Sequence, residues 1–85
     1  MKLSVNGMTI TLALVWGLAM LLTGVVNVIW PSYGRAFLDA MASVYPGYSG
    51  AATGVQVIVG TLYGVLDGAI AGALIAWLCN RFARA

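Results

Sequence analysis

The longest uncharged stretch of the chain constrains its fold more than any other feature. Residues 8–30 contain no Asp, Glu, Lys or Arg and are largely apolar. Because an α-helix rises about 1.5 Å per residue, about 20 such residues cross the ~30 Å hydrocarbon core of a bilayer. Backbone polar groups in lipid must be hydrogen-bonded within their own segment, so the stretch predicts a transmembrane helix. Asn6 is the candidate cap at its start, and Pro31 ends it.

A second apolar stretch, residues 51–82, contains a single acid, Asp67. It is longer than one membrane crossing requires, so we expect a helix over about residues 55–80 whose ends leave the hydrocarbon. Aromatic and basic side chains prefer the boundaries between membrane and water. This preference selects four interface anchors: Trp30, Tyr33, Trp77 and Arg81.

Residues 31–50 connect the two stretches. Arg35 and Asp39 stand four residues apart, the spacing of an ion pair on a helix, and they predict a short helix over residues 33–44 that lies in the membrane interface. An irregular loop is the alternative. The following Tyr45-Pro46-Gly47-Tyr48 predicts a turn, because proline fixes φ and glycine permits a positive φ.

Composition excludes a soluble domain and most chemistry. The 85 residues include four Lys or Arg and two Asp or Glu, whereas 62% are apolar and the mean hydropathy is +1.00. Six charged residues cannot cover the surface of a small soluble domain. With no His and one Cys, the chain cannot assemble a zinc or haem site or a Ser-His-Asp triad. A net charge of +2 is too small for a nucleic-acid surface. We therefore expect a non-enzymatic, all-α membrane protein, one domain over residues 1–85 built as a two-helix transmembrane hairpin with a short interfacial connector, without a cofactor or nucleic-acid partner.

The basic residues predict the orientation in the membrane. Lys2, Arg81 and Arg84 lie outside the connector, and Arg35 alone lies within it. The positive-inside rule then places both termini in the cytoplasm and the connector on the far side of the membrane. A signal peptide is the alternative for the first stretch, but the stretch exceeds the usual 7–15 apolar residues and no Ala-x-Ala-like cleavage site follows.

Glycines recur every four residues in the second predicted helix. They form one narrow ridge, because four residues advance a helix by about 400°. Such a ridge predicts close backbone packing against another helix, in this chain, a second copy or a different subunit. The first helix offers a complementary groove of small side chains that would receive the ridge. The predicted packing residues are Gly60, Gly64, Gly68 and Gly72 on the ridge, with Gly17 and Gly24 in the groove.

Asp67 is the most distinctive polar residue, because a carboxylate near the middle of a bilayer is costly and usually faces protein or water. Gln56, Gly60, Tyr63 and Asp67 project from one side of the helix. We expect Asp67 to hydrogen-bond Tyr63 or the facing Asn27 as a clasp between helices. The alternative is a proton- or cation-handling site.

Several motifs resemble a family of small bacterial two-helix membrane proteins often described as holin-like. They are Trp16-Gly17, Tyr45-Pro46-Gly47-Tyr48, Asp67-Gly68 with Gly72, and Ala76-Trp77-Leu78-Cys79-Asn80. The resemblance implies a helical hairpin in a bacterial inner membrane.

These features favour a function based on association between helices in the bilayer. The leading hypothesis is an accessory or structural subunit of a larger or homo-oligomeric membrane complex. The first alternative is a holin-like pore, and the second is a proton- or cation-linked channel element that uses Asp67.

Overall fold

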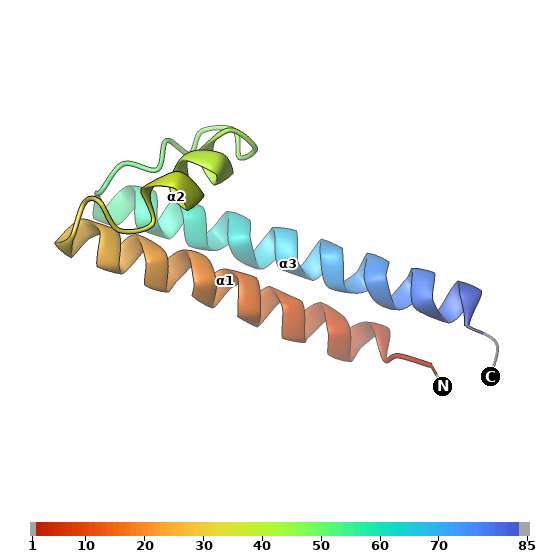
Figure 1. Cartoon of the computed structure of the whole chain (residues 1–85). Coiled ribbons are helices and arrows are strands. Elements are labelled where there is room, and N and C mark those ends of the chain that lie inside the picture. The colour runs from red at the N-terminus through yellow and green to blue at the C-terminus, as the bar shows by residue number, and fades with distance from the viewer. Residues whose placement is uncertain (1, 84–85) are drawn as a thin grey trace.

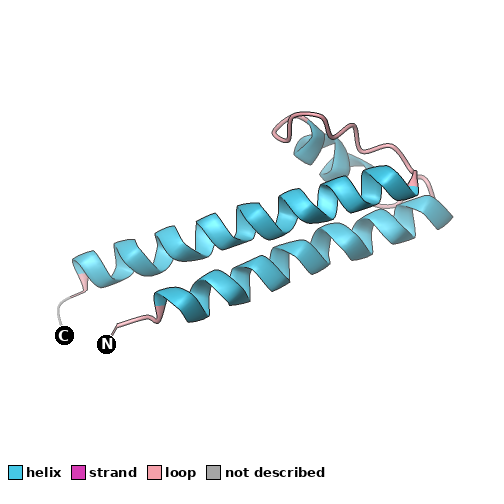
Figure 2. Ribbon diagram, turned by 180° about the vertical axis from the view of Figure 1, so that it is seen from behind, coloured by secondary structure: helices cyan, strands magenta, loops and turns pink. Residues whose placement is uncertain are grey.

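A computed structural model describes residues 2–83, which form three helices: α1 (Val5–Ile29), α2 (Arg35–Ala42) and α3 (Gly54–Phe82). The helices α1 and α3 lie antiparallel along their whole length, and α2 lies beside the end where the chain turns (Figures 1 and 2). The predicted all-helical fold with two long apolar helices is confirmed, since α1 and α3 are each long and apolar enough to cross a membrane. Arg84, used above for orientation, lies outside the described residues.

Hydroxyl side chains begin both long helices. The Ser4 hydroxyl accepts a hydrogen bond from the Gly7 amide at 3.0 Å, so Ser4 caps α1 and the prediction of Asn6 as the cap is wrong. Asn6 lies inside the first turn instead. The Thr53 hydroxyl caps α3 by accepting from the Gln56 amide at 3.2 Å. These caps satisfy amide donors that have no partner within a helix.

The glycine ridge of α3 lies against α1. A Cβ atom built on Gly68 would overlap the carbonyl oxygen of Leu12, and one on Gly72 would overlap that of Met8. No methyl group fits at either position, so glycine is required for the backbones to approach this closely. The first helix of the same chain thus occupies the ridge.

The reciprocal contact differs from the prediction. The groove at Gly17 and Gly24 does not receive glycines; it receives the side chains of Val65 and Val57. The two helices therefore interlock in steps of four residues, since large side chains of each pack over glycines of the other. The α1 residues that lie over the α3 ridge are Met8, Leu12, Trp16 and Met20.

Both ends of the hairpin are closed by an asparagine. At the open end, the Asn80 amide donates to the Leu3 carbonyl and accepts from the Leu3 amide, both at 2.7 Å. At the turn, Asn27 is buried and donates to the carbonyls of Pro31 and Tyr33, both at 2.8 Å. These bonds fix the register of the helices and bring the two ends of the described chain together.

The four predicted interface anchors lie on the outside of the hairpin. Trp30, Tyr33 and Arg81 are exposed, as is Trp77. Trp30 and Tyr33 lie at the turn, whereas Trp77 and Arg81 lie near the end of α3. The pairs therefore stand at opposite ends of the long axis.

Candidate functional site

One side of α3 forms the surface on which the connector docks. The four residues predicted to share this side each touch a different part of the connector. Gln56 accepts from the Ser49 amide at 2.8 Å, and a Cβ on Gly60 would lie 2.8 Å from the Tyr48 ring. The Tyr63 hydroxyl donates to the carbonyl of Pro46, and Asp67 accepts from the Tyr45 hydroxyl at 2.7 Å. The polar side of α3 is therefore covered by this chain's own connector.

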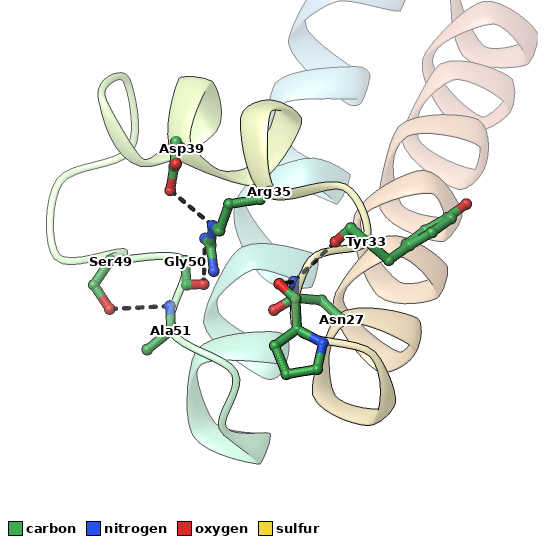
Figure 3. A network of polar contacts seen from close by, with 8 residues as sticks. Asn27, Tyr33, Arg35, Asp39, Ser49, Gly50 and Ala51 are labelled. Carbon is green, nitrogen blue, oxygen red and sulfur yellow. Dashed lines mark hydrogen bonds and ion pairs between the residues drawn. The ribbon is translucent and has the colours of Figure 1, made fainter.

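The connector is shaped by α2 and by a bridge across its two limbs (Figure 3). Gly34 begins α2 with a φ of 64°, a backbone conformation that favours glycine. The Arg35 guanidinium donates to Asp39 at 3.0 Å, as its spacing predicted, and also to the carbonyl of Gly50 at 2.6 Å. Arg35 therefore ties the outgoing limb of the connector to the returning limb.

Figure 3 also shows Asn27 directed at the turn near Tyr33. Both hydrogens of the Asn27 amide group are used there, on the carbonyls of Pro31 and Tyr33. The expectation that Asn27 faces Asp67 is wrong, because it holds the chain where α1 ends.

The tip of the connector is the predicted turn. The Tyr48 amide donates to the Tyr45 carbonyl at 3.1 Å, and Gly47 has a φ of 82°. Proline at the second position and a glycine with positive φ at the third are typical of a type II turn. The turn directs the rings of Tyr45 and Tyr48 inward, where both are buried.

The hydroxyl of Tyr45 joins the two long helices. It accepts from the indole nitrogen of Trp16 on α1 at 3.1 Å and donates to the carboxylate of Asp67 on α3 at 2.7 Å. Asp67 is therefore part of a clasp, but the expected partners, Tyr63 and Asn27, are wrong. The clasp joins the connector to both helices.

Aromatic stacking holds Tyr45 in place. Its ring stacks on that of Tyr63 with centroids 4.9 Å apart and an angle of 8° between the planes. Tyr45 and Tyr48 also pack with Met20 and Leu38 into the buried core under the connector. Burial raises the pKa of the Tyr45 hydroxyl to about 12, and its hydrogen bond to Asp67 acts in the same direction. The hydroxyl is therefore a stable donor throughout the physiological pH range.

Sequence reasoning missed Tyr45 and Trp16 as parts of the site. Both occur in motifs singled out above, but local spacing does not show that a residue of the connector returns to the middle of α3. The sequence did contain a signal: Tyr45 and Tyr48 are the first and last residues of a predicted turn, which brings their side chains close together. Within residues 2–83, no three His, Cys, Asp or Glu side chains gather closely enough to hold a metal ion.

Fold and site together define a helical hairpin whose connector is docked on one side of α3. Comparisons of the chain with family models, with curated proteins and with solved structures find no match. The resemblance to the holin-like family therefore stays a prediction.

Proposed function

We propose that this chain is a non-enzymatic integral membrane protein that acts as an accessory subunit by packing against other transmembrane helices. The observation that carries the proposal is that the polar side chains of the long helices bond to the connector, whereas the outer faces of both helices are apolar. Asp67, Tyr63, Gln56 and Asn27 all hydrogen-bond the connector. The outer faces of α1 and α3 are left to large apolar side chains.

The exterior supports a lipid environment. Large apolar side chains remain exposed along both helices, including Ile10 and Leu22 on α1 and Ile58 and Leu62 on α3, each about 60% exposed or more. Continuous apolar surface of this kind marks contact with a membrane or another protein. The surface therefore offers lipid and apolar helices the same favourable contact.

The connector supports the same proposal. Its tip reaches Asp67, which lies 13 residues into α3, or ~20 Å along the helix. Irregular backbone at membrane depth is tolerated where it is buried in protein. Here the Pro46 and Gly50 carbonyls and the Ser49 amide are all hydrogen-bonded.

The docked connector favours an accessory subunit over a pore. A pore needs a polar stripe open to water along the bilayer, and the polar side of α3 is covered over Gln56 to Asp67. The glycine ridge is likewise filled by α1. Partners must therefore bind surfaces of α1 and α3 that neither the connector nor the opposite helix occupies, and we place the protein in a bacterial inner membrane.

Two measurements test the proposal. The tagged chain is expressed, membranes are washed with alkaline carbonate, and the protein is then purified in a mild detergent. We expect it to stay in the washed membranes and to purify with a stoichiometric partner protein. Release by carbonate contradicts membrane insertion. Rapid loss of membrane potential on induction supports the pore, and an ion flux abolished by Asp67→Asn supports the channel element.

A further inference from the structure

A groove opens between α1 and α3 next to the connector tip. Its volume is about 240 Å³, and its walls are apolar apart from one carboxyl group. Leu12 and Trp16 line it from α1; Asp67, Gly68, Ala71 and Ile75 line it from α3. Gly68 is buried against Leu12, so Ala71 is the smallest side chain that the groove leaves partly open on α3.

Only one of the two carboxyl oxygens of Asp67 is hydrogen-bonded within the described chain. One oxygen, Oδ2, accepts from Tyr45, whereas Oδ1 has no hydrogen-bond partner among residues 2–83. Asp67 itself is partly exposed and borders the groove. The unused oxygen is therefore available to a group that enters the groove.

No cation in the described chain balances Asp67. Within residues 2–83, the ion pair formed is Arg35 with Asp39, and Arg35 also binds Gly50. Arg81 lies 14 residues further along α3, or ~21 Å away, and Lys2 lies at that same end of the hairpin, next to the Leu3 that bonds Asn80. A second copy would place its own cations at the same levels, so it cannot supply one opposite Asp67.

The depth of Asp67 along α3 makes a carboxyl group without a cationic partner energetically unfavourable. It lies 13 residues from Gly54 and 15 from Phe82, at the centre of α3. In a bilayer spanned by α3, this is the depth at which an ionised side chain is most unfavourable and pairs with another group.

We propose that the groove docks a transmembrane helix of a different protein, and that a Lys or Arg at the middle of that helix pairs with the free oxygen of Asp67. This inference rests on the proposed membrane function and adds the chemistry of the partner. The long basic side chain would lie along the apolar walls of the groove, with its charged end at Asp67. Tyr45 holds the carboxylate in place through its other oxygen.

A fluorescence experiment in vesicles tests the pairing. Cys79 is exposed and is the single cysteine of the chain, so a donor dye is attached there and the protein is reconstituted in phosphatidylcholine vesicles. The probes are leucine-rich transmembrane peptides with an acceptor dye, identical except for Lys or Leu at the central position. We expect the Lys peptide to bind about 5- to 30-fold more tightly, as polar contacts between helices do in model peptides.

Three variants identify the residue. Asp67→Asn keeps an acceptor for Tyr45 and removes the charge, so the preference for the Lys peptide should disappear while helicity is unchanged. Asp67→Glu keeps the charge and should retain a preference. Asp39→Asn, which removes the other acid of the chain, should leave the preference unchanged.

The outcomes separate this inference from the proposed function. A chain that does not insert into vesicles overturns both. A chain that inserts but binds the Lys and Leu peptides equally overturns the groove alone, as does a preference that survives in Asp67→Asn.

Discussion

At the scale of single residues, the Tyr45 hydroxyl links the connector to both long helices. It connects Trp16 and Asp67, two groups on different helices that have no hydrogen bond to each other. Removing it leaves a partly buried indole N–H and a carboxylate oxygen without their partner. The cost of such unpaired groups exceeds the net value of an ordinary hydrogen bond.

Tyr45→Phe tests this role, because phenylalanine keeps the ring that stacks on Tyr63. We expect the hairpin to lose about 1–3 kcal/mol of stability and the connector to become more sensitive to protease. The measurement is thermal or denaturant unfolding in detergent, with limited proteolysis. Tyr33→Phe is the matched control, since Tyr33 is 49% exposed, and it should change stability by less than about 0.5 kcal/mol. Equal effects of the two substitutions contradict the role of Tyr45.

The same hydroxyl predicts a pH dependence. The pKa of Tyr45 is about 12 in the folded chain, against 10.0 for an unperturbed tyrosine. Between these values the unfolded state has released a proton that the folded state keeps, so stability falls as pH rises from about 10 to 12. Below pH 10 the full contribution of the Tyr45 hydroxyl to stability is present. The measurement is an absorbance titration of tyrosinate in the wild type and in Tyr45→Phe. The difference between the two curves should show the Tyr45 hydroxyl titrating near pH 12. Titration of this hydroxyl near pH 10 would contradict the buried clasp.

At the scale of elements, the contact between α1 and α3 depends on glycine in one helix and on large side chains in the other. Gly68 is the tightest point, since a Cβ there would overlap the Leu12 carbonyl. Leu62 and Leu74 lie on the same helix but are 65% and 53% exposed. The two kinds of position therefore distinguish the packed side of α3 from its outer side.

Gly68→Leu should separate the helices and destabilise the hairpin by about 3 kcal/mol or more, because overpacking against backbone cannot be relieved by rotamer changes. Leu62→Phe and Leu74→Phe, which also add bulk, should cost less than about 0.5 kcal/mol. Thermal unfolding in one detergent at one concentration compares all three. Tolerance of leucine at position 68 would contradict the observed packing.

The elements were more predictable than their contacts. Uncharged length, the Arg35–Asp39 spacing and the Pro-Gly pair predict the helices and the turn, because each signal is local. The partner of Asp67 depends on where the connector lies in three dimensions, and helix geometry identifies only which α3 residues share its side. For the same reason the groove at Gly17 is predicted to receive the glycine ridge, whereas the side chain of Val65 lies there.

At the scale of the whole molecule, the start of α1 and the end of α3 lie together and the connector lies at the opposite end (Figure 1). In a membrane crossed by both helices, the two ends must therefore face one compartment. Lys2 and Arg81 lie at this end and Arg35 lies in the connector. The positive-inside rule predicts that the compartment is the cytoplasm.

Reporter fusions test this orientation. A reporter fused after Ala85 should be active in the cytoplasm, whereas one fused after Gly47, in the connector, should be active in the periplasm. The connector fusion ends before α3 and therefore reports the first crossing alone. A periplasmic reporter at position 85 would overturn the orientation and the number of crossings.

The bonds between Leu3 and Asn80 have a consequence for the order of synthesis. They join residues 77 positions apart, so they form only after residue 80 has left the ribosome. At ~5–20 residues per second, about 4 to 15 s pass between the two residues. The valines that fill the α1 groove follow sooner: Val57 is 33 residues after Gly24 and Val65 is 48 residues after Gly17, or about 2 to 10 s at the same rate. Until then, the groove of a nascent α1 is open to the side chains of any neighbouring helix that fit over Gly17 and Gly24, and fast emergence of α3 protects the chain from mispairing.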